Sequence, residues 1–243
     1  MASQRTETTG VTASVDRTRW WGFWLYAAAS VLHVAAISFD LTAIVYPTKL
    51  TLMPLLAVAA GWYLFRTRIL TSRGSEGGTV RTTVLLLLAI AFSWLGDGAA
   101  FFFPMLDDEL PAMLLCFGVA HLLYIWLFAR RIGVYRIPVW TLVYAAWWGI
   151  MIAVLWPHLG ALLIPVMIYG LVLGGTAVAS TRGGTLTAIG GAFFLASDTI
   201  LALRLFLPGI SGELTSPWVM LTYTLGQGLL VAGVVRHLRE QRP

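Results

Sequence analysis

The chain contains eight apolar runs, each long enough to cross a lipid bilayer. A spanning helix needs about 20 predominantly apolar residues. The runs are joined by short connections, several of which carry Pro, a residue common where helices begin or end. We place the boundary between the fifth and sixth runs at Pro157. The predicted spans cover residues 20–39, 47–65, 82–103, 111–129, 137–156, 158–179, 184–206 and 216–235.

The composition agrees with a bilayer environment and argues against several other classes of protein. Hydrophobic residues make up 58% of the chain and charged residues 11%, with a mean hydropathy of +0.81, whereas a soluble domain has about 25% charged residues. A single cysteine, Cys116, excludes an internal disulfide. The sequence has no phosphate-binding Gly-rich loop, no nucleophile motif and no His or Cys cluster of metal-binding spacing. We therefore expect an all-α polytopic membrane protein with no metal and no cofactor.

Basic residues predict the orientation, because cytoplasmic loops of membrane proteins are rich in Lys and Arg. Fourteen arginines fall in alternate connections and at the two ends of the chain: Arg5, Arg17, Arg19, Arg66, Arg68, Arg73, Arg81, Arg130, Arg131, Arg136, Arg182, Arg236, Arg239 and Arg242. The opposite connections hold Asp40, Asp107, Asp108, Glu109 and Glu213, with Arg204 at a helix end. Both termini should therefore be cytoplasmic. The +5 net charge reflects these loop anchors and does not indicate nucleic-acid binding.

The predicted domain layout is simple. Residues 1–18 are polar and lack an apolar segment, so we expect a disordered cytoplasmic tail and not a signal peptide. Residues 19–236 form one eight-helix transmembrane domain, and residues 237–243 form a short basic cytoplasmic tail. We expect an integral protein of a bacterial cytoplasmic (inner) membrane.

Three charged residues lie inside the spans: Lys49, Asp97 and Asp198. Ionisable residues at membrane depth are costly and commonly functional. Asp97 follows Arg81, and Asp198 follows Arg182, by the same number of residues, which corresponds to about 24 Å along a helix. Lys49 lies about 25 Å before Arg66. All three groups should therefore share one level in the outer half of the bilayer. An Asp97–Lys49 ion pair with a purely structural role is the alternative.

The two Asp segments indicate an internal repeat of four helices. Phe92 stands five residues before Asp97, and Phe193 stands five residues before Asp198. Four spans separate the two segments, and an even number of spans preserves orientation, so the predicted 4+4 repeat is parallel. Membrane proteins commonly place binding sites at such repeat interfaces.

Further polar residues occur at helical spacing near the two Asp residues. Ser93 precedes Asp97 by one turn, and Ser197 directly precedes Asp198. The following span of each unit carries a polar pair, which is His121 and Tyr124 in the first unit and Tyr223 and Gln227 in the second. Helix rise places His121 and Gln227 about 10 Å deeper than the carboxylates. We therefore expect a polar cleft that runs inward, although these groups could also be interhelical hydrogen-bonding residues.

The order and spacing of these motifs resemble the lysoplasmalogenase (YhhN-like) membrane family over residues 20–236. The matching elements are Leu95-Gly96-Asp97, His121-Leu122-Leu123-Tyr124, Ser197-Asp198, Tyr223, Gln227 and Thr48-Lys49, although Leu50 stands where the family more usually has Pro. The resemblance implies hydrolysis of the vinyl-ether bond of a lysoplasmalogen, a single-chain phospholipid, to a fatty aldehyde and a glycerophospho-base. It also implies that Asp97 and Asp198 are the catalytic acid and base.

The residues themselves agree with this chemistry but leave other functions open. Of two carboxyl groups in a low-dielectric site, one can stay protonated near neutral pH and act as an acid while the other orients water. Lys49, Ser93, His121, Tyr124, Ser197, Tyr223 and Gln227 are the expected supporting or substrate-binding residues. The main alternative is a proton-coupled carrier of a small or lipid substrate that uses the same Asp and Lys groups. An intramembrane aspartyl protease and a structural protein are further alternatives.

Overall fold

The computed structural model describes residues 18–67, 69 and 77–241. Over these residues the chain is helical and contains no strand, which confirms the predicted all-α architecture. The short connecting helices are α5 (Ala99–Phe102), η1 (Phe128–Ile132), η2 (Val139–Thr141), η3 (Gly160–Leu162) and η4 (Thr181–Gly183). The long helices are α2 (Trp21–Ser38), α3 (Thr42–Arg66), α4 (Gly77–Asp97), α6 (Leu110–Leu127), α7 (Leu142–Leu159), α8 (Leu163–Ser180), α9 (Thr185–Phe206) and α10 (Gly212–Glu240).

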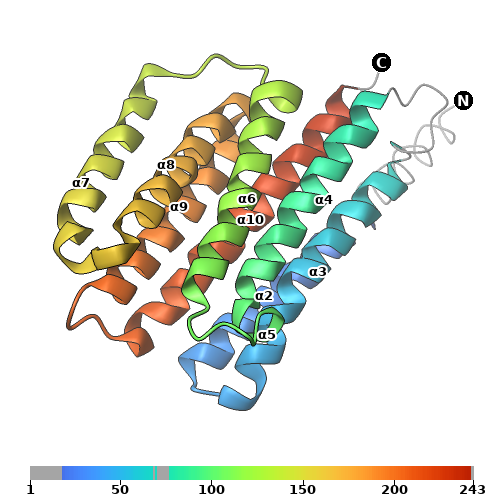
Figure 1. The fold of residues 1–243 in the computed structure, drawn as a ribbon. Helices are drawn as coiled ribbons and strands as arrows, with labels where there is room; N and C mark the ends of the chain where they lie inside the picture. Colours follow the sequence, from blue (N-terminus) through green and yellow to red (C-terminus); the bar gives the residue numbers. More distant parts are fainter. Residues whose placement is uncertain (1–17, 68, 70–76, 242–243) are drawn as a thin grey trace, which may run out of the picture.

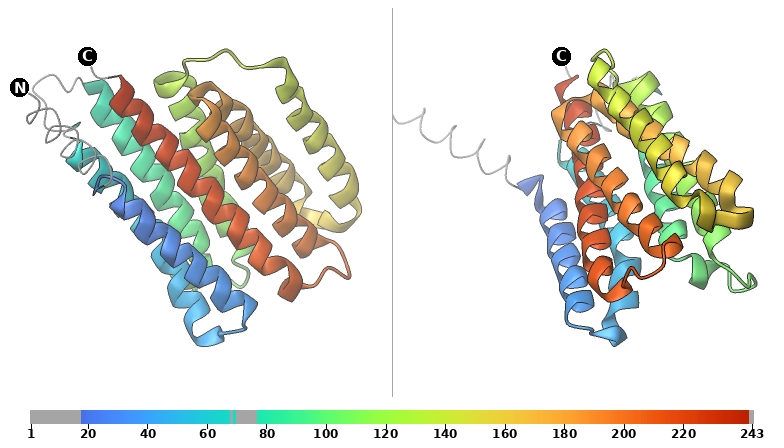
Figure 2. Two further views of the ribbon diagram at one scale, coloured as in Figure 1. Left: turned by 180° about the vertical axis from the view of Figure 1, so that it is seen from behind. Right: turned by 90° about the vertical axis from the view of Figure 1, so that its left-hand side faces the viewer.

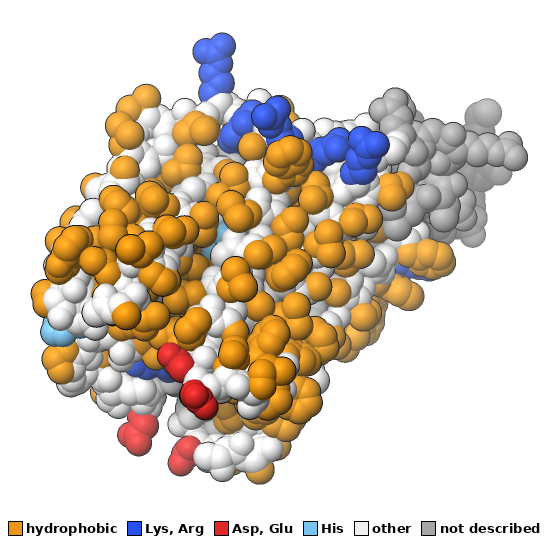
Figure 3. All heavy atoms as spheres, in the orientation of Figure 1, with side chains coloured by type: hydrophobic (Ala, Val, Ile, Leu, Met, Phe, Trp, Pro, Cys, Tyr) orange, Lys and Arg blue, Asp and Glu red, His pale blue; other side chains and the backbone are white. Residues whose placement is uncertain are grey.

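These long helices are the membrane spans. Seven stretches of the described chain are long and apolar enough to cross a bilayer, and one of them, Val139–Gly183, is 45 residues long and contains both α7 and α8. The described bundle therefore has eight spanning helices, as the apolar runs predict. Large hydrophobic side chains are exposed along its sides (Figure 3), where they would contact lipid chains and not water.

Helix α10 is the central helix of the bundle. In the 18 most apolar consecutive residues of α10, 67% of the residues are buried, whereas the corresponding share is 28–39% in the other spanning stretches. It packs against α2, α3, α4 and α9 (Figures 1 and 2). Helix α7 lies at the edge of the bundle, next to α8 and α9. The helix with the greatest burial thus carries Tyr223 and Gln227 into the centre of the molecule.

Charge separates along the long axis of the bundle. Lys and Arg side chains gather at the end where α2 begins and α10 ends, and Asp and Glu gather at the opposite end (Figure 3). This pattern agrees with the predicted orientation, in which the basic end faces the cytoplasm. Helix α10 continues to Glu240, past the predicted end of the membrane domain at residue 236. Of the predicted tail at residues 1–18, residues 1–17 lie outside the described residues.

Two predicted span boundaries were wrong. Pro157 lies inside α7, and the chain turns instead at Gly160, whose φ of 50° is a left-handed conformation that glycine adopts at low cost. The third span, predicted over residues 82–103, is interrupted because α4 ends at Asp97 and α5 begins at Ala99. A Cβ atom at Gly98 would lie 2.6 Å from the Phe102 ring and 2.8 Å from the Leu50 side chain. A side chain at this position, directly beside the first carboxylate, would therefore have to displace Phe102 and Leu50.

Helix α3 tolerates Pro54 in its interior because another helix replaces the lost hydrogen bond. Proline has no backbone N–H, so the carbonyl of Leu50, one turn earlier, has no helical donor. The Trp94 indole Nε1 of α4 donates to this carbonyl over 2.9 Å. The contact joins α3 to α4 next to Lys49 and one turn before Asp97, and it therefore helps to fix the relative positions of these two charges.

Candidate active site

A cavity of about 790 Å³ lies at the acidic end of the bundle. Its volume is within the usual range for small-molecule sites, roughly 300–1,000 Å³. Both intramembrane carboxylates, Asp97 from α4 and Asp198 from α9, line this one cavity. Lys49, Ser197 and Tyr223 line it as well. The structure thus brings together five of the nine residues that the sequence singled out.

Asp97 is buried and lies against a cation and a hydroxyl group. Its side chain is 4% exposed, and its Oδ1 is 4.0 Å from Nζ of Lys49, whose side chain is 30% exposed. Its Oδ2 accepts a 2.7 Å hydrogen bond from the hydroxyl of Tyr223. An adjacent cation and a hydrogen-bond donor both favour the ionised form of a carboxyl group.

Asp198 has a different set of partners. The Tyr169 hydroxyl of α8 donates a hydrogen bond to its Oδ2, and Nε2 of His121 is 3.9 Å from the same oxygen. Nε2 of His121 is also 3.4 Å from the Tyr169 hydroxyl, while Nδ1 lies 3.1 Å from Oγ1 of Thr176. Asp198, Tyr169 and His121 therefore form a continuous chain of groups through which a proton can be shared.

The partners of the two carboxylates follow the predicted repeat. Each Asp lies on the third helix of its unit and contacts a residue from the second helix of that unit, Lys49 for Asp97 and Tyr169 for Asp198. Each also lies close to a residue from the last helix of the other unit, Tyr223 for Asp97 and His121 for Asp198. The site thus lies between two similar halves whose partner residues differ in chemistry.

Three of the predicted site residues form a buried network and do not line the cavity. The Tyr124 hydroxyl donates to Oε1 of Gln227 over 2.7 Å, and Nε2 of Gln227 donates to Oγ of Ser93 over 2.9 Å. All three residues are fully buried. The expected inward polar cleft is therefore closed, and this network links α4, α6 and α10. Ser197 does line the cavity, and its Oγ donates to the carbonyl of Val219.

The depth predicted for His121 was wrong. Counting residues from Arg130 placed it about 10 Å deeper than the carboxylates, yet its imidazole lies beside Asp198. Tilted helices cross at angles, so equal residue counts along two helices do not give equal depths. His121 itself is fully buried and does not line the cavity, and it reaches the cavity only through Asp198 and Tyr169.

His33 acquires a role that the sequence did not indicate. It lines the cavity from α2, and its Nδ1 is 2.8 Å from Oγ1 of Thr48. Oγ1 of Thr48 donates to the carbonyl of Ile44, so it accepts the hydrogen of Nδ1. Nε2 of His33 has no hydrogen-bond partner within the described part of the chain. This nitrogen is buried, so among the described residues it is an unpaired polar atom within the wall of the cavity.

The sequence model of the YhhN family matches residues 44–234 of this chain. The chain belongs to the YhhN family. This is the family of lysoplasmalogenases. No curated protein and no solved structure matches the chain. The matched region begins in α3, before Lys49, and ends in α10 beyond Gln227, so it contains every residue that was singled out from the sequence.

Tyr169 is the main residue of this YhhN-family site that sequence reasoning missed. It lies in a strongly apolar span with no charged neighbour, and the repeat drew attention to other helices. The depth estimate could have found it, because its position lies about 20 Å from Arg182, close to the level estimated for Asp198. A tyrosine hydroxyl at the depth of an intramembrane carboxylate is a useful signal in an otherwise apolar helix.

The geometry of this YhhN-family site permits acid–base chemistry on a ligand in the cavity. Two carboxyl groups with different partners can divide the roles of proton donor and proton acceptor. Among the described residues, no group of three or more His, Cys, Asp or Glu side chains is placed to hold a metal ion.

Proposed function

We propose that this protein is a lysoplasmalogenase-type hydrolase, which cleaves the vinyl-ether bond of a single-chain phospholipid to a fatty aldehyde and a glycerophospho-base. The observation that carries the proposal is that two intramembrane carboxylates from separate helices, Asp97 and Asp198, line one cavity. Membership of the YhhN family supports it. The location supports it too, because the cavity lies within a bundle of helices that span the bilayer in which such a lipid resides.

The chemistry requires one acid and one base. Protonation of the alkene carbon that is not bonded to oxygen gives an oxocarbenium ion, and water then adds to the carbon bonded to oxygen. The resulting hemiacetal collapses to the aldehyde and the free glycerol hydroxyl, so the net reaction consumes one water and needs no cofactor. A carboxylic acid can deliver the first proton, and a carboxylate can stabilise the cation and accept a proton from the water.

We assign the base to Asp97 and the acid to Asp198. Each carboxylate accepts a hydrogen bond from a tyrosine hydroxyl, and the ammonium group of Lys49 additionally favours the ionised form of Asp97. Asp198 instead adjoins the Tyr169 hydroxyl and the His121 imidazole. This chain of hydrogen-bonding groups can return a proton to Asp198 after each turnover.

Hydrolysis by the purified protein tests the proposal directly. Wild-type protein in detergent should release aldehyde from lysoplasmenylethanolamine. The matched control is the saturated 1-O-alkyl lysophospholipid, which has no alkene to protonate and should give no aldehyde. A proton-coupled carrier that uses the same Asp and Lys groups would hydrolyse neither lipid. Absence of aldehyde from the vinyl-ether lipid would therefore contradict the hydrolase proposal and favour the carrier.

Replacement of Tyr169 by Phe should lower kcat by up to about 10-fold with little change in KM, because a hydrogen bond to a neutral carboxylic acid contributes about 0.5–1.5 kcal/mol. Tyr169 acts here as a positioning residue that orients Asp198 and connects it to His121. Tyr144→Phe is the matched control, since Tyr144 lies on α7 and does not line the cavity. An equal loss in both variants, or a rise in KM alone, would contradict this role. A steady-state aldehyde assay separates kcat from KM.

A further inference from the structure

We infer that the outer part of the cavity binds the phosphate group of a zwitterionic lysophospholipid, with Arg204 as the phosphate ligand. The inference rests on the proposed function, because it concerns the headgroup of the lipid whose vinyl ether reacts between the carboxylates. It adds a binding site in the same cavity to the reacting groups already described.

Of the two cations that line the cavity in the described part of the chain, Arg204 is the one that does not already lie beside a carboxylate and can therefore bind an anionic ligand. Lys49 and Arg204 are the only Lys or Arg residues among those that line it, and Lys49 already lies beside Asp97. Arg204 is half-buried, and its Nη1 donates a 2.6 Å hydrogen bond to Oγ of Ser216. Within the described ranges no carboxylate lies within 4.0 Å of its guanidinium. A guanidinium has five N–H donors in a planar fork that matches a phosphate group.

Two helices independently place this cation further toward the acidic end of the bundle than the carboxylates. Along α9, Arg204 follows Asp198 by six residues, or about 9 Å. Along α10, Ser216 precedes Tyr223, the partner of Asp97, by seven residues, or about 10 Å. In a lysoplasmalogen a glycerol unit separates the vinyl ether from the phosphate. A lipid with its vinyl ether at the carboxylates and its headgroup directed outward would therefore extend its phosphate toward Arg204.

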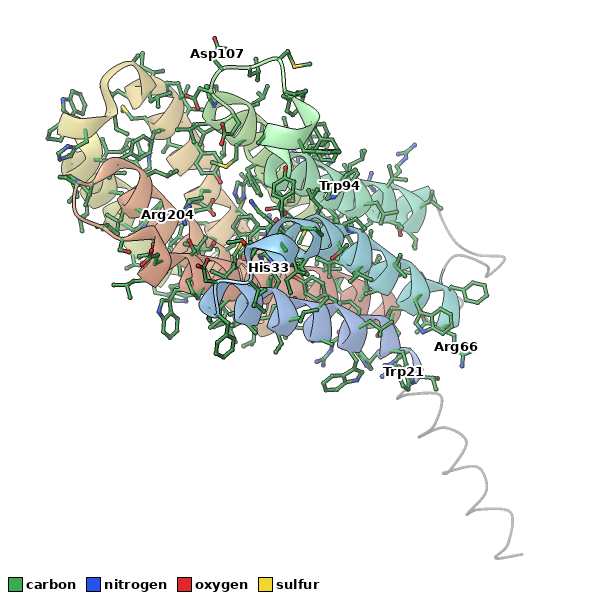
Figure 4. All side chains as sticks on the ribbon, turned by 90° about the horizontal axis from the view of Figure 1, so that it is seen from below. Trp21, His33, Arg66, Trp94, Asp107 and Arg204 are labelled. Carbon is green, nitrogen blue, oxygen red and sulfur yellow. The ribbon has the colours of Figure 1, made fainter. Side chains whose placement is uncertain are left out.

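The next group outward has the opposite charge. Glu213 lies about 4.5 Å further along α10 than Ser216 and also lines the cavity. Figure 4, viewed onto this end of the bundle, shows Arg204 there. From the inside of the cavity toward the acidic end of the bundle, the charged groups are therefore the two Asp carboxylates, then the Arg204 guanidinium, then the Glu213 carboxylate. This order complements a phosphate followed by an amine, and it disfavours a headgroup whose outermost part is neutral or anionic.

The apolar lining accommodates the hydrocarbon chain. Met113 and Leu114 from α6, Val166 from α8, and Leu201 and Leu205 from α9 all line the cavity. These side chains lie on the same helices that carry His121, Tyr169 and Asp198, so a chain packed against them can extend from the reacting bond. The cavity therefore offers separate surfaces for the chain, the reacting bond and the headgroup.

Binding of non-hydrolysable lipids tests the headgroup site without catalysis. The probes are a 1-O-hexadecyl lysophospholipid with a phosphoethanolamine headgroup and 1-O-hexadecylglycerol, which lacks the phosphate. Wild-type protein in detergent should bind the phospholipid 10- to 100-fold more tightly, as expected for charge-assisted hydrogen bonds. Arg204→Gln should remove this preference and leave hexadecylglycerol binding unchanged. Arg81→Gln, at the opposite end of the bundle and outside the cavity lining, is the matched control and should bind like the wild type.

Each remaining outcome has a defined meaning. Equal binding of the two lipids by wild type, or equal loss of both in Arg204→Gln, would overturn the phosphate site. Displacement of the phospholipid by inorganic phosphate at similar concentration would identify free phosphate as the ligand and overturn the lipid assignment. A phosphoglycerol headgroup that binds as well as phosphoethanolamine would overturn the role of Glu213. The wild-type protein could prefer the phospholipid and yet release no aldehyde. That result would support the headgroup site and contradict only the hydrolase proposal.

Discussion

Replacement of either membrane aspartate by asparagine should lower the rate of aldehyde release at least 100-fold. Asparagine keeps the size of the side chain but can neither deliver a proton nor accept one, and acid–base groups typically contribute 10²–10⁴-fold to rates. Asp97→Asn and Asp198→Asn should both show this loss with lysoplasmenylethanolamine. Asp107→Asn, in an exposed loop that does not line the cavity, should retain full activity.

Two further measurements make this test decisive. Thermal unfolding in detergent separates loss of chemistry from loss of fold, because a catalytic role requires inactive variants that still unfold like the wild type. Added formate should restore part of the rate in Asp97→Asn, where a small carboxylate can replace the base, but not in Asp198→Asn, where the acid is missing. Retained turnover in either variant would remove that residue from the mechanism, and rescue of Asp198→Asn alone would reverse the two roles.

Replacement of Gly226 by Ala should be among the most destabilising single changes in the bundle. A Cβ atom at Gly226 would lie 2.7 Å from the backbone nitrogen of Phe194, and one at Gly190 would lie 2.7 Å from that of Leu230. Helices α9 and α10 therefore pack backbone to backbone, as small residues allow in membrane proteins. The added methyl group must push the helices apart, which costs about 1–3 kcal/mol of unfolding free energy for overpacking.

The control for this change is another helical glycine. A Cβ atom at Gly149 of α7 would meet nothing within 4 Å, and Ala is favoured over Gly in a helix by up to about 1 kcal/mol. Gly149→Ala should therefore unfold at the same temperature as the wild type or slightly above it. Gly226→Ala should also lose activity, because α9 carries Asp198 and α10 carries Tyr223. A Gly226→Ala protein as stable as the wild type would show that the two helices can separate freely.

The architecture was predictable because the bilayer imposes simple requirements. Every span needs a long apolar run, and basic residues mark one end of the bundle, so the eight helices follow from the sequence. The meeting of Asp97 and Asp198 at one cavity was predictable from their matching depth and from the four-helix repeat. These inferences depend on length and charge, which act over whole helices and tolerate small errors of position.

The details that the sequence did not predict depend on individual contacts. The turn at Gly160 was misplaced because Pro157 is a strong helix-breaking signal that α7 nevertheless accommodates. The cavity-lining position of His33 depends on its hydrogen bond to Thr48. Whether Gln227 lines the cavity or lies in a sealed network depends on side-chain directions, and its bonds to Tyr124 and Ser93 turn it away from the cavity. Residue spacing gives the face of a helix but not the packing of its neighbours.

The position of the cavity at the acidic end has a consequence for cellular sidedness. If the basic end faces the cytoplasm and the protein is the hydrolase proposed above, the site is reached from the outer leaflet and the water-soluble product is released on the non-cytoplasmic side of the membrane. Sealed vesicles with the protein in one orientation would then consume lipid from only one leaflet. Lipids made on the inner leaflet would be processed only after transbilayer movement, which would make that movement a control point for their turnover.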